Sequence, residues 1–225
     1  MPDIDWNICL PLSFGNAGIA VFTLNRALPH DPLRNGFEAF IQERFDKAHN
    51  ANVRHFMPEL FGLNDDTGKL CAVTGIRLAA SEKLFLESYL DTPIEDRIRA
   101  STGRMVDRQS IVEVGNLASS NMGSARLSII TITWLLAQTG LEWVAFTGNT
   151  SLVNSFNRLG LRPVTLCPAD PARLGDDHRA WGRYYETRPS VCIGDIRSGF
   201  MHLNNTGLFE RLGLPLSLEQ HCHVA

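Results

Sequence analysis

A chain of 225 residues, with 44% hydrophobic and 20% charged residues, has the composition of a globular protein large enough to build a substantial core. The formal net charge of -3 gives no electrostatic basis for nucleic acid or an anionic membrane as the main partner. The 5 cysteines are scattered and form no CxxC pair, so they indicate neither a disulfide framework nor a zinc knuckle and are typical of reduced thiols in the cytoplasm.

No segment has the features of a secretory signal or a membrane span. Asp3 and Asp5 precede the first apolar run, an order that secretory signals do not have. The best candidate for a span, residues 129–137, contains Thr131 and Thr133 and is well short of the roughly 20 residues that a span requires. We therefore expect a cytoplasmic protein without a transmembrane segment.

Hydrophobic periodicity and turn signals divide the chain into alternating helices and strands. The first half is predicted to contain a helix at 33–48, an antiparallel hairpin of strands at 59–63 and 70–77, and a helix at 94–101. The segment before that last helix, 84–90, is compatible with a strand or a short helix. The second half is predicted to run as strand 111–117, helix 126–138, strand 142–147, helix 151–159 and closing strands at 162–166 and 190–193. This alternation predicts an α/β fold with a partly parallel sheet covered by helices.

The polar segment between the strand at 111–117 and the helix from about Arg126 is the first candidate site. It contains Ser120 and the run Gly123-Ser124-Ala125. A strand that passes through a glycine-bearing loop into a helix presents unpaired backbone N–H groups and the positive end of the helix dipole, which suit a pyrophosphate. One glycine alone is more often part of a plain strand-to-helix connection, so a second feature is needed.

The next strand and helix supply that second feature. Asn149 follows the strand, Phe156 lies within the helix, and Gly160-Leu161 closes it. This order resembles the GCN5-related N-acetyltransferase (GNAT) superfamily, in which a strand ends at Asn, the helix carries an aromatic residue, and a Gly-Phe pair closes it. The resemblance implies a GNAT-like α/β fold with a mixed, partly parallel central sheet flanked by helices.

The phosphate loop of the GNAT superfamily, Gln/Arg-x-x-Gly-x-Gly/Ala, is also partly present. Gly123 and Ala125 match its last two fixed positions, whereas Ser120 departs from the first. Two partial motifs in the right order and at the right distance favour phosphate binding over a plain connection.

Two further resemblances concern longer stretches. Residues 33–197 resemble the thermostable hemolysin family, notably at 111–118, 143–147, 167–171 and 181–185. That family name records a lytic phenotype rather than a mechanism, and no segment here resembles a lytic amphipathic helix. The strand Glu113-x-Gly115-Asn116 is loosely similar to the Glu-x-Ser-Arg strand of acyl-homoserine lactone synthases, GNAT-fold enzymes that take acyl groups from acyl carrier protein, with Asn116 in place of Arg.

These resemblances imply an acyltransferase that moves an acyl group from acyl-CoA, or from the phosphopantetheine of acyl carrier protein, to an amine or hydroxyl of a small molecule. Glu113 is then the candidate base, with Asn116 beside it, and the Leu117 and Ala118 amides face the thioester oxygen. GNAT enzymes often use Tyr to protonate the leaving thiol, and Phe156 lacks the hydroxyl, so Tyr184 or Tyr185 is expected to replace it. The residues expected to bind the donor are Leu117, Ala118, Ser120, Gly123, Ser124, Ala125, Arg126, Asn149 and Phe156.

Two other functions are also compatible with the sequence, and the C-terminal segment is predicted to be separate from the main domain. The missing Tyr is compatible with a non-catalytic module that binds acyl thioesters, and the hemolysin resemblance with a membrane-active protein on the same scaffold. We expect an acyltransferase domain at 1–197 and an appendage at 198–225 with one short helix. The His221-Cys222-His223 run in that appendage has no spaced partner, so no metal is expected.

Overall fold

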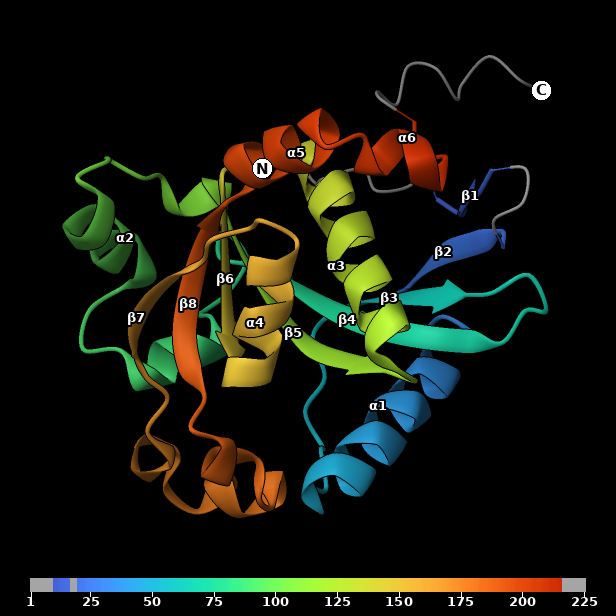
Figure 1. Ribbon diagram of the computed structural model, residues 1–225. Coiled ribbons are helices and arrows are strands. Elements are labelled where there is room, and N and C mark those ends of the chain that lie inside the picture. The colour runs from blue at the N-terminus through green and yellow to red at the C-terminus, as the bar shows by residue number, and fades with distance from the viewer. Residues whose placement is uncertain (1–9, 17–19, 216–225) are drawn as a thin grey trace.

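An eight-stranded sheet in the order β1-β2-β3-β4-β5-β6-β8-β7 crosses the molecule in the computed structural model (Figure 1). The structure describes residues 10–16 and 20–215, so the His221-Cys222-His223 run lies outside the described residues. The strands are β1 (Leu12–Phe14), β2 (Phe22–Ala27), β3 (Glu59–Asn64), β4 (Leu70–Leu78), β5 (Ile111–Ser119), β6 (Trp143–Gly148), β7 (Val164–Pro168) and β8 (Ser190–Asp195). Within the described residues β5 and β6 form the one parallel pair, so the mixed, partly parallel sheet predicted from the sequence is confirmed.

Helices cover both faces of this sheet. They are α1 (Arg34–His49), α2 (Ile94–Thr102), α3 (Met122–Ala137), α4 (Thr150–Arg158), α5 (Ile196–Asn205) and α6 (Leu208–Leu212). The 3₁₀ segments within the described residues are η2 (Phe85–Tyr89), η3 (Arg108–Ser110), η4 (Pro171–Trp181) and η5 (Tyr184–Thr187). The ambiguous segment at 84–90 is therefore a short helix. Strands β1 and β2 were not predicted, because three and six residues beside glycines give little periodic signal.

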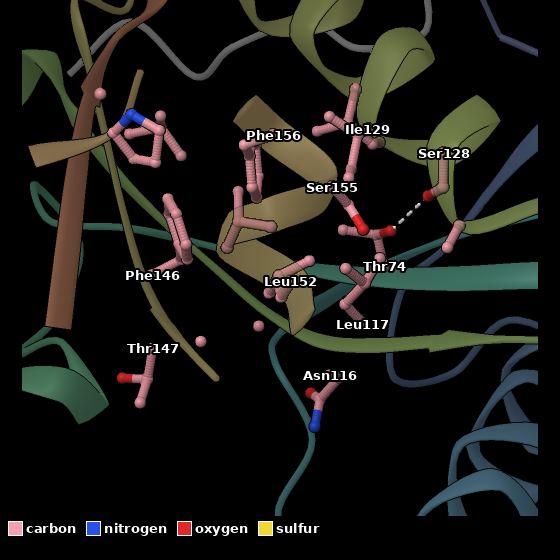
Figure 2. Close-up of a pocket in the computed structure, with 18 of the residues that line it drawn as sticks. Thr74, Asn116, Leu117, Ser128, Ile129, Phe146, Thr147, Leu152, Ser155 and Phe156 are labelled. Atoms are coloured by element: carbon pink, nitrogen blue, oxygen red, sulfur yellow. Dashed lines mark hydrogen bonds between the residues drawn. The ribbon is translucent and has the colours of Figure 1, made fainter. Parts of the chain in front are cut away.

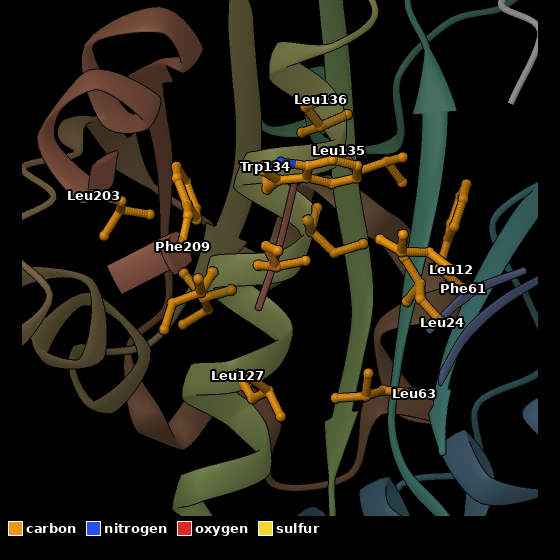
Figure 3. Packing of buried hydrophobic residues seen from close by; sticks show 14 of the residues in the cluster. Leu12, Leu24, Phe61, Leu63, Leu127, Trp134, Leu135, Leu136, Leu203 and Phe209 are labelled. Carbon is orange, nitrogen blue, oxygen red and sulfur yellow. The ribbon is translucent and has the colours of Figure 1, made fainter. Parts of the chain in front are cut away.

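The largest part of the core lies between the sheet and helices α3, α5 and α6. Trp134 of α3 is fully buried beside Leu203 of α5 and Phe209 of α6, as Figure 3 shows. The sequence predicted one short helix after residue 198, whereas the described residues hold α5 and α6, both packed into this core. The division of the chain at residue 197 stays a prediction.

Two features of β5 open the sheet. β5 pairs with β6 only from Ile111–Trp143 to Val114–Phe146, although β5 continues to Ser119. Beyond these pairs a gap separates β5 from β6. On its outer side β5 stays paired with β4 as far as Ser119, and β6 stays paired with β8 as far as Gly148. In addition, the register of β4 and β5 shifts between Gly115 and Ala118, which leaves β5 with one extra residue, a β-bulge. The bulge therefore lies at the edge of the gap.

Candidate functional site

A cavity of about 1180 Å³ passes through the gap between β5 and β6 and reaches both faces of the sheet. On one face its walls are α3 and α4, as Figure 2 shows, and on the other they are α1, η2 and the segment from η4 to η5. Single small-molecule sites usually measure about 300 to 1,000 Å³. This cavity is therefore large enough for a donor on one face and an acceptor on the other.

The N-terminus of α3 lies at one end of the cavity. The helix begins at Met122, about four residues earlier than predicted, because the Asn121 side chain caps it by accepting a hydrogen bond from the Ser124 N–H at 2.9 Å. Gly123, Ser124 and Ala125 are therefore in the first turn of the helix and not in a preceding loop. Among the described residues, the Ser124 and Ala125 amides have acceptors, and those of Met122 and Gly123 do not. These two amides point out of the positive end of the helix.

The predicted donor residues differ in how close they lie to the cavity. Those that line it are Leu117, Ala118, Ala125, Asn149 and Phe156. Those that do not line it are Ser120, Gly123, Ser124 and Arg126, all at the outer end of α3. Ser120 holds that end together, because its hydroxyl lies 3.2 Å from the hydroxyl of Ser124, and Arg126 is exposed to solvent.

Asn116 occupies the β-bulge with a φ of 49°, a left-handed conformation that Asn adopts more readily than most residues. Its side-chain oxygen accepts a hydrogen bond from the Met57 N–H at 2.7 Å, and its amide group donates to the His55 carbonyl at 3.5 Å. The side chain thus ties the 55–57 segment to the bulge. Asn116 lines the cavity, its side chain is hydrogen-bonded to backbone groups, and its role at the site stays a prediction.

Glu113 is buried, with 3% of its surface exposed, on the face of the sheet opposite α3. Its two carboxylate oxygens accept hydrogen bonds from the Phe85 and Leu86 N–H groups of η2 at 2.8 and 2.9 Å, and Arg77 lies 3.7 Å away. Burial raises the pKa of Glu113 to about 7, against the two amides and Arg77, which lower it. A carboxyl with this pKa and a place on the cavity wall is suited to accept a proton near neutral pH.

A second buried carboxylate, Glu87, holds η2 in the position that Glu113 requires. It accepts hydrogen bonds from the Leu84 and Ile94 N–H groups at 2.9 and 3.0 Å and from Arg108 at 2.7 Å. Burial acts to raise the pKa of Glu87, but Arg108 and the two amides outweigh it and lower the pKa to about 2. Glu87 therefore stays charged and acts as a structural anchor, in contrast to Glu113.

The α3 face of the gap contains groups that sequence reasoning did not identify. Thr74 lies on β4 opposite the bulge, and its hydroxyl is 2.7 Å from that of Ser128 on α3; both residues are buried (Figure 2). On the other side of the cavity Phe156 stacks on Phe146, with ring centroids 4.8 Å apart. Thr74 and Ser128 are 54 residues apart, so no local pattern relates them.

The opposite face of the gap is an aromatic chamber, formed by Phe45, His49, Phe85, Tyr89, Trp181, Tyr184 and Tyr185. The hydroxyls of Tyr185 and Tyr89 are 2.5 Å apart, and that of Tyr184 donates to the Thr147 carbonyl at 3.4 Å. Burial raises the pKa of all three tyrosines, and burial followed by Arg183 lowers that of His49. At neutral pH the tyrosines keep their protons and His49 is uncharged.

The described residues show neither a metal centre nor a membrane span. No group of three or more His, Cys, Asp or Glu side chains within 10–16 and 20–215 is placed to hold a metal ion. In the same ranges no helix combines the length and the apolar character needed to cross a membrane.

This arrangement, a parallel pair that separates at a bulge beside a helix N-terminus, defines a GNAT-like α/β fold. The chain belongs to the thermostable hemolysin family, whose model matches residues 27–200. The resemblance to the thermostable hemolysin family predicted from the sequence is thereby confirmed. A comparison with curated proteins gave no match.

Solved structures with a similar fold are acyl-transferring enzymes of low sequence identity. FeeM, an N-acyl amino acid synthase from uncultured soil microbes, is 13% identical, with a TM-score of 0.55 over 85% of this chain and 100% of that one. The acyl-homoserine lactone synthase LasI is 10% identical, with a TM-score of 0.51 over 79% and 90% of the two chains. BjaI, a CoA-dependent acyl-homoserine lactone synthase solved with SAM and isopentyl-CoA, is 13% identical, with a TM-score of 0.52 over 85% and 90%. At these identities the similarity establishes a common fold.

Proposed function

We propose that the protein is an acyltransferase that moves an acyl group from a phosphopantetheine thioester to an amine or hydroxyl of a small molecule. One observation carries the proposal: a single cavity joins the N-terminus of α3 to Glu113, a buried carboxyl whose pKa is about 7, across the gap between β5 and β6. An anion site and a base joined across a sheet are what transfer from a phosphate-bearing donor requires.

The donor is placed on the α3 face. The Met122 and Gly123 amides, with the helix dipole, bind its phosphates, and Arg126 lies close enough along the helix to add a positive charge. The bulge at Asn116 and Leu117 holds the thioester carbonyl, with backbone amides of Leu117 and Ala118 as donors to its oxygen. Acyl-CoA and acyl carrier protein present the same phosphopantetheine arm, and both are donors under this proposal.

The acceptor is placed in the aromatic chamber. Its nitrogen or oxygen attacks the thioester carbon, the carbon–sulfur bond breaks, and the acceptor's proton passes to Glu113 directly or through water. Both oxygens of Glu113 already accept backbone hydrogen bonds, which favours transfer through water. The leaving thiolate takes a proton from Tyr185, which is protonated at neutral pH because burial raises its pKa, and the proton held by Glu113 then returns to Tyr185 through water. Phe156, on the other face, has no proton to give.

Two properties of the similar enzymes belong to this proposal. FeeM is an N-acyl amino acid synthase and BjaI uses CoA, so a small amine acceptor and a CoA donor are the first to test. The cytoplasmic location predicted from the sequence is also part of it.

A panel of acyl-CoA thioesters and an acyl carrier protein tests the donor site by calorimetry, with mass spectrometry for acyl transfer to a mixture of amines and alcohols. Gly123→Asp places a carboxylate where the donor phosphates bind, and its Cβ would lie 3.1 Å from the Asn121 side-chain oxygen. We expect the Kd to rise at least about tenfold. The matched control is Gly36→Asp, near the start of α1, where a Cβ meets open space.

Three results separate the proposal from its alternatives. Binding and transfer by the wild type, with binding weakened in Gly123→Asp alone, support it. Tight thioester binding without transfer to any acceptor indicates a binding module instead. Liposome leakage that persists in both Gly123→Asp and Glu113→Gln indicates a membrane-active protein.

A further inference from the structure

The residues that line the cavity continue away from the gap, along α3 and α4 to α5, and we call this part of the cavity the branch. Successive turns of α3 line it at Ile129, Ile132 and Leu136, which lie on one side of the helix. Seven residues of helix rise about 10 Å, so the branch extends well beyond the position of the bulge. Its other walls come from β6, α4, the segment after α4 and α5, at Val144, Phe146, Leu152, Phe156, Leu161 and Ile196.

The walls of this branch are mainly apolar, with the hydroxyls of Ser128, Thr133 and Ser155 between the apolar side chains. Ile129, Ile132 and Leu136 are each at most 5% exposed, and the side chains opposite them are aliphatic or aromatic. Charged or titratable lining residues are Arg162 after α4, Asp195 before α5 and His202 in the second half of α5. Protein interiors are close-packed, and an apolar space gains dispersion contacts only when an apolar group fills it. The chemistry of the branch thus matches a hydrocarbon and not water or a charged group.

We propose that this branch, the acyl channel, binds the hydrocarbon chain of a medium- or long-chain acyl group, so that the protein discriminates against acetyl donors. The inference rests on the proposed function, which places the thioester carbonyl at the bulge. From that point the acyl channel is the apolar path on the donor face, whereas the aromatic chamber on the other face contains Glu113 and hydroxyl groups that suit the acceptor.

The far end of the acyl channel is set by Gly199 of α5. A Cβ at this position would lie 3.3 Å from the Leu161 side chain and 3.5 Å from that of Thr133. The glycine therefore lets α5 pack closely against Leu161 and α3, and a larger side chain here would press on these two cavity-lining residues. Gly199 and Leu161 are specificity-determining positions for the length of the chain.

The experiment measures kcat/KM, or Kd where turnover is slow, for acetyl-, hexanoyl-, decanoyl- and hexadecanoyl-CoA. The wild type is expected to favour at least one long donor over acetyl-CoA by tenfold or more. Gly199→Leu is expected to lower that ratio at least tenfold by filling the channel. Leu161→Ala is expected to shift the preferred donor toward longer chains. Met201→Trp, on the exposed side of α5, is the control and is expected to leave the ratio unchanged.

Different results would overturn the acyl channel and the proposed acyl transfer. Equal use of acetyl and long-chain donors by the wild type, or the same loss for every donor in Gly199→Leu, would overturn the acyl channel while leaving acyl transfer intact. Binding of no acyl thioester by the wild type would overturn the proposed function and the channel together. If circular dichroism shows that Gly199→Leu does not fold, the shift in Leu161→Ala decides, and no shift overturns the inference.

Discussion

The two buried carboxylates beside η2 respond to pH in opposite directions, which yields a test that requires no substrate. The pKa of Glu113 is raised from 4.5 to about 7, and this difference corresponds to about 3 kcal/mol of unfolding free energy. Below 4.5 the carboxyl is protonated in both the folded and the unfolded states, and its contribution is fully present. Between pH 4.5 and 7 the unfolded state is ionised while the folded state keeps the proton, so that contribution is lost progressively and is gone above 7.

Urea denaturation of the wild type and Glu113→Gln, from about pH 5 to about pH 8, measures this loss. Because Gln does not titrate, the unfolding free energy of the wild type is expected to fall by about 2.5 kcal/mol relative to the variant over this range, since part of the effect is already lost by pH 5. Glu87→Gln is the matched control, since the pKa of Glu87 is lowered to about 2. The stabilisation by Glu87 is fully present above pH 4.5 and is lost only as the pH falls toward 2. The difference in unfolding free energy between the wild type and Glu87→Gln is therefore expected to stay constant from about pH 5 to about pH 8.

If the difference in unfolding free energy between the wild type and Glu113→Gln did not change with pH, the pKa of Glu113 would be ordinary. The carboxyl would then be ionised throughout this range, held by the Phe85 and Leu86 amides as a structural group. Its assignment as the base would lose its main support.

Three further predictions concern activity and stability. Where transfer is observed, a pH–rate profile of the wild type is expected to show kcat/KM rising with pH, with an apparent pKa of about 7. Glu113→Gln is expected to lower kcat about 10²- to 10⁴-fold and to remove this rise with pH. Asn121→Ala is expected to lower the unfolding free energy by about 1 kcal/mol through loss of the α3 cap, measured by urea denaturation, whereas Asn121→Asp retains it. Asn116→Ala removes the hydrogen bond to Met57 and also places a residue that disfavours positive φ at this position, whereas Asn116→Gly removes only the hydrogen bond. The alanine variant is therefore expected to lower the melting temperature more than the glycine variant, and equal shifts would contradict this prediction.

The elements with long periodic patterns could be predicted from the sequence, and their positions in space could not. The first helix was expected at 33–48 and is observed at Arg34–His49, because Phe37 and Ile41 mark a buried face over four turns. The start of α3 was misplaced because Asn121 was interpreted as part of a flexible loop, although Asn is among the preferred capping residues.

The candidate base illustrates the same division. Glu113 could be singled out from its strand, but its pKa depends on burial and on amides of η2, which lies 28 residues earlier. The contact between Thr74 and Ser128 likewise depends on α3 crossing β4. Contacts between segments distant in the sequence, and the burial that they cause, are tertiary properties.

The residues that carried the resemblance to the GNAT superfamily act mainly by shaping the cavity. Asn149 caps α4 by accepting the Leu152 N–H at 3.0 Å, which defines where that helix starts. Gly160 has a φ of +76°, and a Cβ there would lie 2.0 Å from the His202 ring, so glycine allows α5 to approach the end of α4. Together they hold α4 over the acyl channel without any need to contact the reacting atoms. Their pattern therefore identifies the fold, while the proposed chemistry depends on β5 and η2, where the buried carboxyl of Glu113 lies.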